Sequence, residues 1–223
     1  MTAAGGIGVL GGSFNPVHLA HLRAAEEVRE GQALDTMLLV PAAVPPHKDA
    51  TGIAPAEHRL RMLELAIAGR SGLVASRLEL DRPGPSYTID TLRALRAEIG
   101  DGRLVFAVGW DAFRDLGTWK EYPEIFAVSD VVVVTRPPGP ARLTLDDIPV
   151  AAKQAFCYDP SSESFRHASG HVLSLQRITA LDISAAAIRA RVAAGRSIGF
   201  LVPAAVETYI EAHRLYRPGD VTR

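Results

Sequence analysis

The chain alternates between short apolar runs and longer segments in which apolar residues recur every three or four positions. Short apolar runs are typical of buried strands, and the longer period is typical of helices that cover a sheet. The pattern predicts strands at Ile7–Leu10, Met37–Val40, Leu73–Ser76, Leu104–Val108, Val131–Thr135 and His171–Leu175. It predicts helices at Leu19–Glu30, Pro55–Ala68, Thr88–Ile99, Asp111–Leu116, Pro123–Val128, Ser184–Ala194 and Pro203–Leu215. We therefore expect an α/β fold: a Rossmann-like, doubly wound, mostly parallel sheet with helices on both faces.

The stretch from residue 137 to residue 170 differs from the rest of the chain. It begins with PPGP and contains DPSSES, and both sequences favour turns. We expect a long irregular connection there, with room for one helix. The two helices expected after it suggest an α/β domain over residues 1–180 and a C-terminal helical subdomain over residues 181–223 packed on it.

Composition and charge narrow the class of protein. The 223 residues are enough for a substantial core, and 48% apolar with 22% charged residues is ordinary for a soluble globular protein. The formal net charge of −1 offers no bulk attraction to nucleic acid or to an anionic membrane, so neither is an expected partner. Cys157 is the single cysteine, which excludes an internal disulfide and fits a reducing compartment. The N-terminal MTAAGG is unlike a signal peptide and the apolar runs are too short to cross a bilayer, so we expect a cytoplasmic protein.

The sequence GGSFNPVHLAH, residues 11 to 21, joins the first expected strand to the first expected helix. We read Gly11 and Gly12 as the turn itself, because glycines let a backbone approach a phosphate closely. The helix start behind them favours an anion, and His18 and His21 would donate hydrogen bonds to the same anion. Two other interpretations remain open at this point: ordinary surface histidines, or a metal-binding pair, for which no third ligand at suitable spacing stands out.

Two known nucleotide-binding motifs offer alternative interpretations of the glycines in this region. Gly6-Ile-Gly8-Val-Leu-Gly11 matches G-x-G-x-x-G, but its first two glycines fall before or inside the expected strand rather than in the turn that follows it. The match therefore does not favour a hydride-transfer cofactor. No P-loop sequence, G-x-x-x-x-G-K-[ST], is present.

Residues 11 to 21 resemble the strand-turn-helix signature of the nucleotidyltransferases, whose common form ends in H-x-G-H. More specifically, the chain from about residue 7 to residue 213 resembles the nicotinate-nucleotide adenylyltransferase family of bacterial NAD biosynthesis. Five further segments carry that resemblance in the same order: PPHK at 45–48, RLRM at 59–62, GPSYTIDTL at 84–92, Gly109-Trp-Asp111 with Trp119, and Ile183-Ser184 with Arg189.

The resemblance implies a reaction. AMP would pass from ATP to nicotinate mononucleotide, giving deamido-NAD and pyrophosphate, by direct attack of the mononucleotide phosphate on the α-phosphorus. Positioning and charge neutralisation would provide most of the catalysis. Mg²⁺ would arrive with ATP, held mostly by substrate oxygens and water, so no dedicated set of metal ligands is expected in the protein. The sequence does not decide between a monomer and a homodimer.

The resemblance also assigns residues to the ATP side. The expected catalytic residues are His18, His21, Lys48 and Arg189, although an isolated lysine is more often a solvated surface residue. The expected ATP-binding residues are Gly11, Gly12, Ser13, Phe14, His18, His21, Gly109, Asp111, Ile183, Ser184 and Arg189, with Asp111 on a ribose hydroxyl.

The mononucleotide would occupy a second set of residues. Backbone N–H groups of Tyr87 and Thr88, at an expected helix start, would bind the nicotinate carboxylate, because free N–H groups favour the acid over the amide. Trp119 would stack on the pyridinium ring, and Arg136 would bind the mononucleotide phosphate. Ser13 and Lys48 complete the expected mononucleotide-binding residues, and Lys48 would supply a cation to phosphates. A core role for Trp119 and simple helix capping by Ser86 and Thr88 stay open as alternatives.

The chain departs from the family pattern at three places. Asn15 stands where aspartate is more common, and Ala20 replaces the glycine of H-x-G-H. Ala185 and Ala186 replace two hydroxyl residues at a helix start expected to face the triphosphate. A lost hydrogen bond to a charged group costs about 1.5–3 kcal/mol, so we expect weaker ATP binding.

Other functions remain as alternatives. A sibling adenylyltransferase would use phosphopantetheine or nicotinamide mononucleotide, although PPHK and SYTIDTL speak against the phosphopantetheine enzyme. A non-catalytic nucleotide-binding module would explain Ala185 and Ala186, although the presence of His18, His21, Lys48 and Arg189 argues against it.

Overall fold

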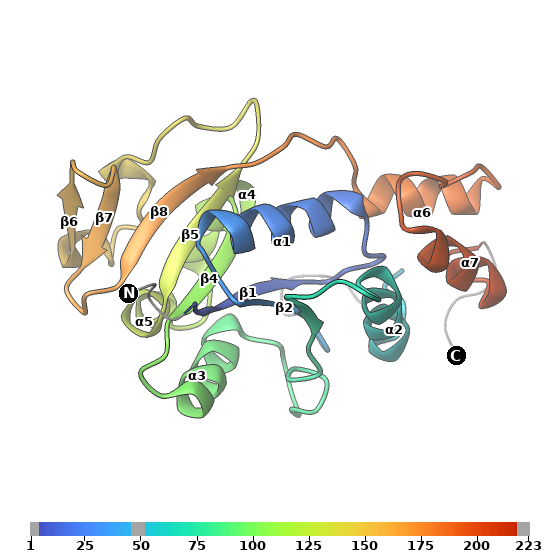
Figure 1. Ribbon diagram of the computed structural model, residues 1–223, viewed down its shortest axis with the longest axis horizontal. Coiled ribbons are helices and arrows are strands. Elements are labelled where there is room, and N and C mark those ends of the chain that lie inside the picture. The colour runs from blue at the N-terminus through green and yellow to red at the C-terminus, as the bar shows by residue number, and fades with distance from the viewer. Residues whose placement is uncertain (1–4, 46–51, 218–223) are drawn as a thin grey trace.

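A computed structural model describes residues 5–45 and 52–217 of the chain. Its centre is an eight-stranded sheet in the order β3-β2-β1-β4-β5-β8-β7-β6 (Figure 1). The strands are β1 Ile7–Gly12, β2 Thr36–Pro41, β3 Leu73–Ala75, β4 Leu104–Gly109, β5 Asp130–Thr135, β6 Phe156–Asp159, β7 Ser164–His167 and β8 Val172–Arg177. Strands β1 to β5 and β8 pair in parallel, whereas β6 and β7 are antiparallel to their neighbours. The predicted α/β, mostly parallel, doubly wound fold is confirmed.

The central strands are apolar at nearly every position because helices cover both faces of the sheet. The helices are α1 Leu19–Gly31, α2 Ala56–Ala66, α3 Thr88–Ile99, α4 Trp110–Arg114, α5 Tyr122–Val128, α6 Ala185–Ala193 and α7 Ala204–Ala212. Successive residues of β4 enter different cores, since strand side chains alternate between faces. Phe106 and Val108 pack with α3, α4 and α5, whereas Val105 and Ala107 pack with α1, α2, α6 and α7.

The order of the strands creates a switch point in the middle of the sheet. From β1 the chain proceeds outward through β2 to β3, and it then crosses to β4 on the other side of β1 and continues to β5. The loops that leave the carboxyl ends of β1 and β4 therefore turn in opposite directions. Open α/β sheets bind ligands in the crevice that this divergence leaves.

The expectation for residues 137–170 was wrong. This stretch contains no α-helix; it forms two short 3₁₀ helices, Leu145–Asp147 and Lys153–Ala155, and the hairpin β6–β7 that extends the sheet past β8. Four-residue strands carry too few positions for a reliable alternation. Tyr158 and Phe165 face each other across the hairpin with ring centroids 5.2 Å apart, a tertiary pairing that fixes its register.

The expectation that Gly11 and Gly12 form the turn was also wrong. Both lie in β1, where Gly11 pairs with Val40 and Gly12 with Pro41 of β2. The strand extends this far because β2 continues to Pro41 and offers a partner for each residue. Phe14 takes a positive φ of 45° just past the strand, and the turn itself lies at Asn15 and Pro16.

The C-terminal helices share a core with the sheet. Ile188 of α6 and Val206 and Ile210 of α7 belong to the same buried cluster as Val105 and Val132 of the central strands. Figure 1 shows α6 and α7 at the end of the molecule opposite the β6–β7 hairpin. The division of the chain at residue 180 stays a prediction. Across residues 5–45 and 52–217, no helix combines the length and the apolar character needed to cross a membrane.

Candidate active site

Two adjoining cavities open at the switch point of the sheet. The larger has a volume of about 710 Å³ and the smaller about 270 Å³. Leu10 and Gly11 of β1, with Ala107 and Gly109 of β4, contribute to the walls of both cavities. A side chain at Gly11 would project into open space, so this glycine keeps the backbone accessible where the cavities meet.

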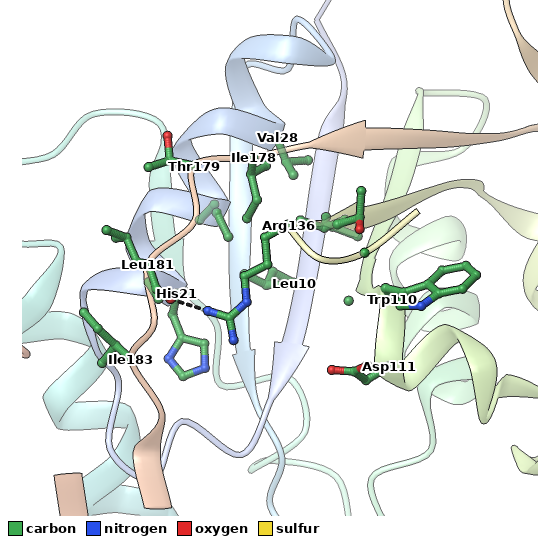
Figure 2. A pocket seen from close by; sticks show the side chains of 18 of the residues that line it. Leu10, His21, Val28, Trp110, Asp111, Arg136, Ile178, Thr179, Leu181 and Ile183 are labelled. Carbon is green, nitrogen blue, oxygen red and sulfur yellow. Dashed lines mark hydrogen bonds between the residues drawn. The ribbon is translucent and has the colours of Figure 1, made fainter. Parts of the chain in front are cut away.

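The larger cavity contains most residues predicted for ATP. Its wall includes seven of them, namely Gly11, His18, His21, Gly109, Asp111, Ile183 and Ser184. Figure 2 shows His21, Arg136 and Leu181 on one side of this cavity and Asp111 with Trp110 on the other. The cavity size falls in the range that holds a ligand as large as a nucleotide.

The two histidines are positioned by the start of α1. His18 is the extended residue immediately before the helix, and His21 lies in the first helical turn. Their rings stack with centroids 3.7 Å apart, and the backbone N–H of His18 donates to Nδ1 of His21 at 3.3 Å. Phe14 supports the pair from one side, with its ring edge-on to His21 at 5.0 Å. The prediction that a strand-to-helix turn brings these histidines together is confirmed.

Burial sets the charge state of His18. Its side chain is only 5% exposed, and burial, followed by the positive charge of Arg136, lowers its pKa to about 4. The Nδ1 atom of His18 is buried and has no hydrogen-bond partner among the described residues. At neutral pH this imidazole is therefore uncharged, so one of its ring nitrogens can donate a hydrogen bond and the other can accept one.

Arg136 lies at the carboxyl end of β5, but in the larger cavity. Its guanidinium donates to the carbonyl of Leu181 and points toward the ring of His21 (Figure 2). The sequence interpretation placed Arg136 with the mononucleotide residues, whereas the structure groups it with the residues predicted for ATP. The strand order explains this difference. β5 follows β4 in the sheet, and the carboxyl end of β5 contributes to the wall of the larger cavity.

Arg189, one turn into α6, lies behind the turn that precedes α1. Its guanidinium donates to the backbone carbonyl of Asn15 at 2.8 Å. It is absent from the walls of both cavities formed by the described residues. Its predicted contact with the triphosphate stays a prediction, and the observed contact is with the protein's own turn.

The smaller cavity contains residues predicted for nicotinate mononucleotide. Ser13, Tyr87, Thr88 and Trp119 all contribute to its wall, and so does Gly12, which was predicted for ATP. Trp119 is half-buried and packs beside Phe106 of β4, with ring centroids 6.3 Å apart. It therefore combines contact with the core and contact with the cavity.

The first turn of α3 presents backbone donors at this cavity. The N–H of Tyr87 already donates to the carbonyl of Pro85, and those of Asp90 and Thr91 donate to the carbonyl of Tyr87. The N–H groups of Thr88 and Ile89 have no acceptor within the described part of the chain. The free donors thus begin at Thr88, one residue later than the sequence suggested.

Ser86 does not cap this helix. Its hydroxyl oxygen accepts hydrogen bonds from the backbone N–H groups of Ala43, at 2.9 Å, and Val44, at 3.3 Å. Tyr87 is the residue before α3, and no side chain caps the helix there. The capping alternative is therefore wrong for Ser86, which instead ties the segment after β2 to the start of α3.

Besides Arg189, two of the predicted site residues are not placed in a cavity wall. Lys48 lies outside the described residues. Phe14 is 2% exposed and contributes to the core beneath α1 rather than to either cavity. A role for Phe14 in supporting His21 follows from its ring contact.

Sequence reasoning assigned no role to Arg59 and Glu79. Glu79 is 7% exposed, lines the smaller cavity and accepts a 2.6 Å hydrogen bond from the hydroxyl of Thr91; burial raises the pKa of its carboxyl. Arg59 is buried on the inner face of α2, beside Met62 and Leu63. The sequence does contain a signal for Arg59. It stands three and four positions before Met62 and Leu63, which are core residues of the same helix, and this spacing places it on the buried face.

Comparisons with known proteins give the relatives of the chain. A family model described as cytidylyltransferase-like matches residues 9–191. A probable nicotinate-nucleotide adenylyltransferase of Geobacter sp. (strain M21) is 48% identical over 94% of this chain and 97% of that protein. A protein of the same name from Syntrophotalea carbinolica is 46% identical over 95% of this chain and 97% of its own length.

Solved structures show the same fold. The Plasmodium falciparum nicotinic acid mononucleotide adenylyltransferase, complexed with NaAD, matches with a TM-score of 0.71 over 95% of this chain and 97% of that chain. A complex of the Plasmodium protein with APC matches with a TM-score of 0.69 over 94% of this chain and 96% of that chain. Both matches have 18% sequence identity and show that the fold is shared.

Proposed function

This chain belongs to the nicotinate-nucleotide adenylyltransferase family, within the cytidylyltransferase-like proteins, and we propose that it transfers AMP from ATP to nicotinate mononucleotide. The products are deamido-NAD and pyrophosphate, as expected of a transferase in NAD biosynthesis. One observation carries the proposal: two cavities of different chemistry meet at Gly11 and Gly109. Two substrates seated in them would have their reacting phosphates at this junction.

The larger cavity suits the triphosphate of ATP. His18 and His21 stand at the start of α1, where the helix dipole adds partial positive charge, and Arg136 faces them. Because burial keeps His18 neutral, its ring would act as a hydrogen-bond donor to phosphate oxygens rather than as a fixed cation. Charge that develops on the transferring phosphoryl oxygens would strengthen these hydrogen bonds in the transition state.

The smaller cavity suits the nicotinate ring. The free backbone N–H groups at the start of α3 favour a carboxylate over an uncharged amide, which selects the acid. The indole of Trp119 offers an electron-rich face to an electron-poor pyridinium. Trp119 and Thr88 line the same cavity, so the two contacts can form together.

Several details remain predictions within this proposal. Mg²⁺ enters with ATP as part of the substrate and neutralises charge on the phosphates. Family resemblance assigns Lys48 to the substrate phosphates and Arg189 to ATP. A cytoplasmic location and the monomer or homodimer state also stay predictions.

The proposal is tested by following pyrophosphate release from purified protein with ATP and Mg²⁺. We expect turnover with nicotinate mononucleotide and a much lower kcat/KM with nicotinamide mononucleotide. Turnover with phosphopantetheine alone, or preference for the amide, would contradict the substrate assignment. ATP binding by calorimetry without turnover on any acceptor would favour the non-catalytic module.

A further inference from the structure

Arg59 is among the most deeply buried side chains of the protein and lies outside the walls of both cavities. It is 1% exposed. Its guanidinium donates to three backbone carbonyls: Nε to Ala54 at 2.8 Å, Nη1 to Ser13 at 2.9 Å, and Nη2 to Ala43 at 3.3 Å. A planar guanidinium can reach several acceptors at once because its donors point in different fixed directions.

The three carbonyls come from separate segments around the two cavities. Ser13 follows β1 and begins the turn that leads to His18. Ala43 follows β2, and its neighbour Ala42 lines the smaller cavity. Ala54 precedes α2. Arg59 therefore joins the segment after β2 and the segment before α2 to the histidine turn.

Other hydrogen bonds reinforce the same three segments. Ala42 N–H donates to the carbonyl of Gly12 at 2.9 Å, which pairs the segment after β2 with the end of β1. The amide oxygen of Asn15 accepts from Ala54 N–H at 3.0 Å and from the hydroxyl of Tyr216 at 2.8 Å. Arg59 is the member of this network that touches all three segments at once.

A buried cation of this kind is costly for a merely structural purpose. No carboxylate lies within ion-pair distance of Arg59 in the described ranges, and burial lowers the pKa of its guanidinium. Replacing buried charged groups with well-packed apolar residues is often neutral or stabilising. The geometry of the three carbonyls gives a functional reason for this arginine, because a displacement of about 1 Å in an active site can lower the rate about 100-fold.

We propose that Arg59 is a positioning residue for adenylyl transfer, which holds the histidine turn, the segment after β2 and the segment before α2 in one arrangement so that the two nucleotides meet at reacting distance. This inference rests on the proposed function. Arg59 acts through the carbonyls of Ser13, Ala43 and Ala54 and touches neither substrate. Its removal should therefore lower kcat far more than it weakens the binding of ATP alone.

The test compares Arg59→Gln and Arg59→Lys with a matched control, Arg61→Gln. Arg61 is on the same helix but exposed, where it pairs with Glu64 at 2.9 Å. With folding checked by circular dichroism and assays run well below the unfolding temperature, we expect Arg59→Gln to lower kcat about 100-fold, with an ATP Kd within about threefold of the wild type. Lysine keeps the positive charge but lacks the planar set of donors that reaches three carbonyls, so Arg59→Lys should have a kcat between those of Arg59→Gln and the wild type. Arg61→Gln should stay within about twofold.

The outcomes separate the two proposals. If the unmodified protein releases no pyrophosphate, the proposed function fails before Arg59 is judged. If the wild type is active and folded Arg59→Gln keeps its kcat while losing thermal stability, Arg59 is only structural and the inference is overturned. Should Arg59→Gln fail to fold, Arg59→Lys decides: a kcat at least about tenfold lower, with ATP binding retained, supports the inference, and a wild-type kcat overturns it.

Discussion

The two cavities offer different groups to a charged ligand. In the larger cavity, the groups that face a ligand are side chains: the stacked rings of His18 and His21, and the guanidinium of Arg136. In the smaller cavity, the free donors are backbone N–H groups at the start of α3, and Trp119 belongs to the same wall. Side chains around a triphosphate can adjust to charge that moves during the reaction, whereas a helix start offers fixed donors that discriminate between an acid and an amide.

The cavities also differ in the buried titratable group that each contains. Burial lowers the pKa of His18 to about 4 and raises that of Glu79 above its ordinary value. Both shifts favour the uncharged form, by opposite movements of the pKa. Burial therefore acts on both groups in the same sense, against the charged form.

The largest effect is expected from removing a histidine of the larger cavity. His18→Ala should lower kcat by about 100-fold or more, because it removes a hydrogen-bond donor that acts on charge formed in the transition state. Steady-state assays of pyrophosphate release should show a KM for nicotinate mononucleotide within about threefold of the wild type, since the smaller cavity is untouched. His213→Ala, at the end of α7, serves as the control. A kcat above about one tenth of the wild type would remove His18 from the catalytic groups.

The buried state of His18 also predicts a dependence of stability on pH. Its folded pKa of about 4 lies below the unfolded value of 6.5, so its contribution is complete above pH 6.5 and is lost as the pH falls toward 4. Between about pH 7.5 and 5.0, the wild type should lose about 2 kcal/mol more unfolding free energy than His18→Asn. Urea unfolding at both pH values measures the difference. Equal losses in both proteins would show that His18 is not protected from protons.

Restoring the hydroxyl residues of the family pattern at positions 185 and 186 tests the binding of ATP in the larger cavity. Ala185 lines the larger cavity at the start of α6, next to the capping Ser184. The double variant Ala185→Ser, Ala186→Thr should lower the KM for ATP about tenfold, because a hydroxyl would add a hydrogen bond to a charged group. The KM for nicotinate mononucleotide should not change. A wild-type KM for ATP at or below that of the double variant would refute the expectation of weaker ATP binding.

The smallest effect is expected at the aromatic wall of the other cavity. Trp119→Ala should raise the KM for nicotinate mononucleotide about fivefold, the equivalent of about 1 kcal/mol of cation–π and stacking interaction. Trp119→Phe should keep part of the affinity. If the KM for ATP rises instead, the assignment of substrates to cavities is reversed.

Local sequence determined a large part of this molecule. The apolar runs of the central strands and the period of the helices place these elements to within a few residues, because burial on both faces of a parallel sheet demands that pattern. The position of His18 and His21 at the start of α1 also follows from the chain alone, since residues three apart in a first helical turn lie close together. Family resemblance supplied the substrates.

Tertiary structure decided the features that join distant segments. Arg136 faces the larger cavity only because of the strand order, and the β6–β7 hairpin exists because β8 offers it a partner. Arg59 reaches Ser13 across 46 positions, and Arg189 reaches Asn15 across 174. The local preference of a segment for helix or strand cannot predict such pairs, since their hydrogen bonds form only after distant segments have packed together.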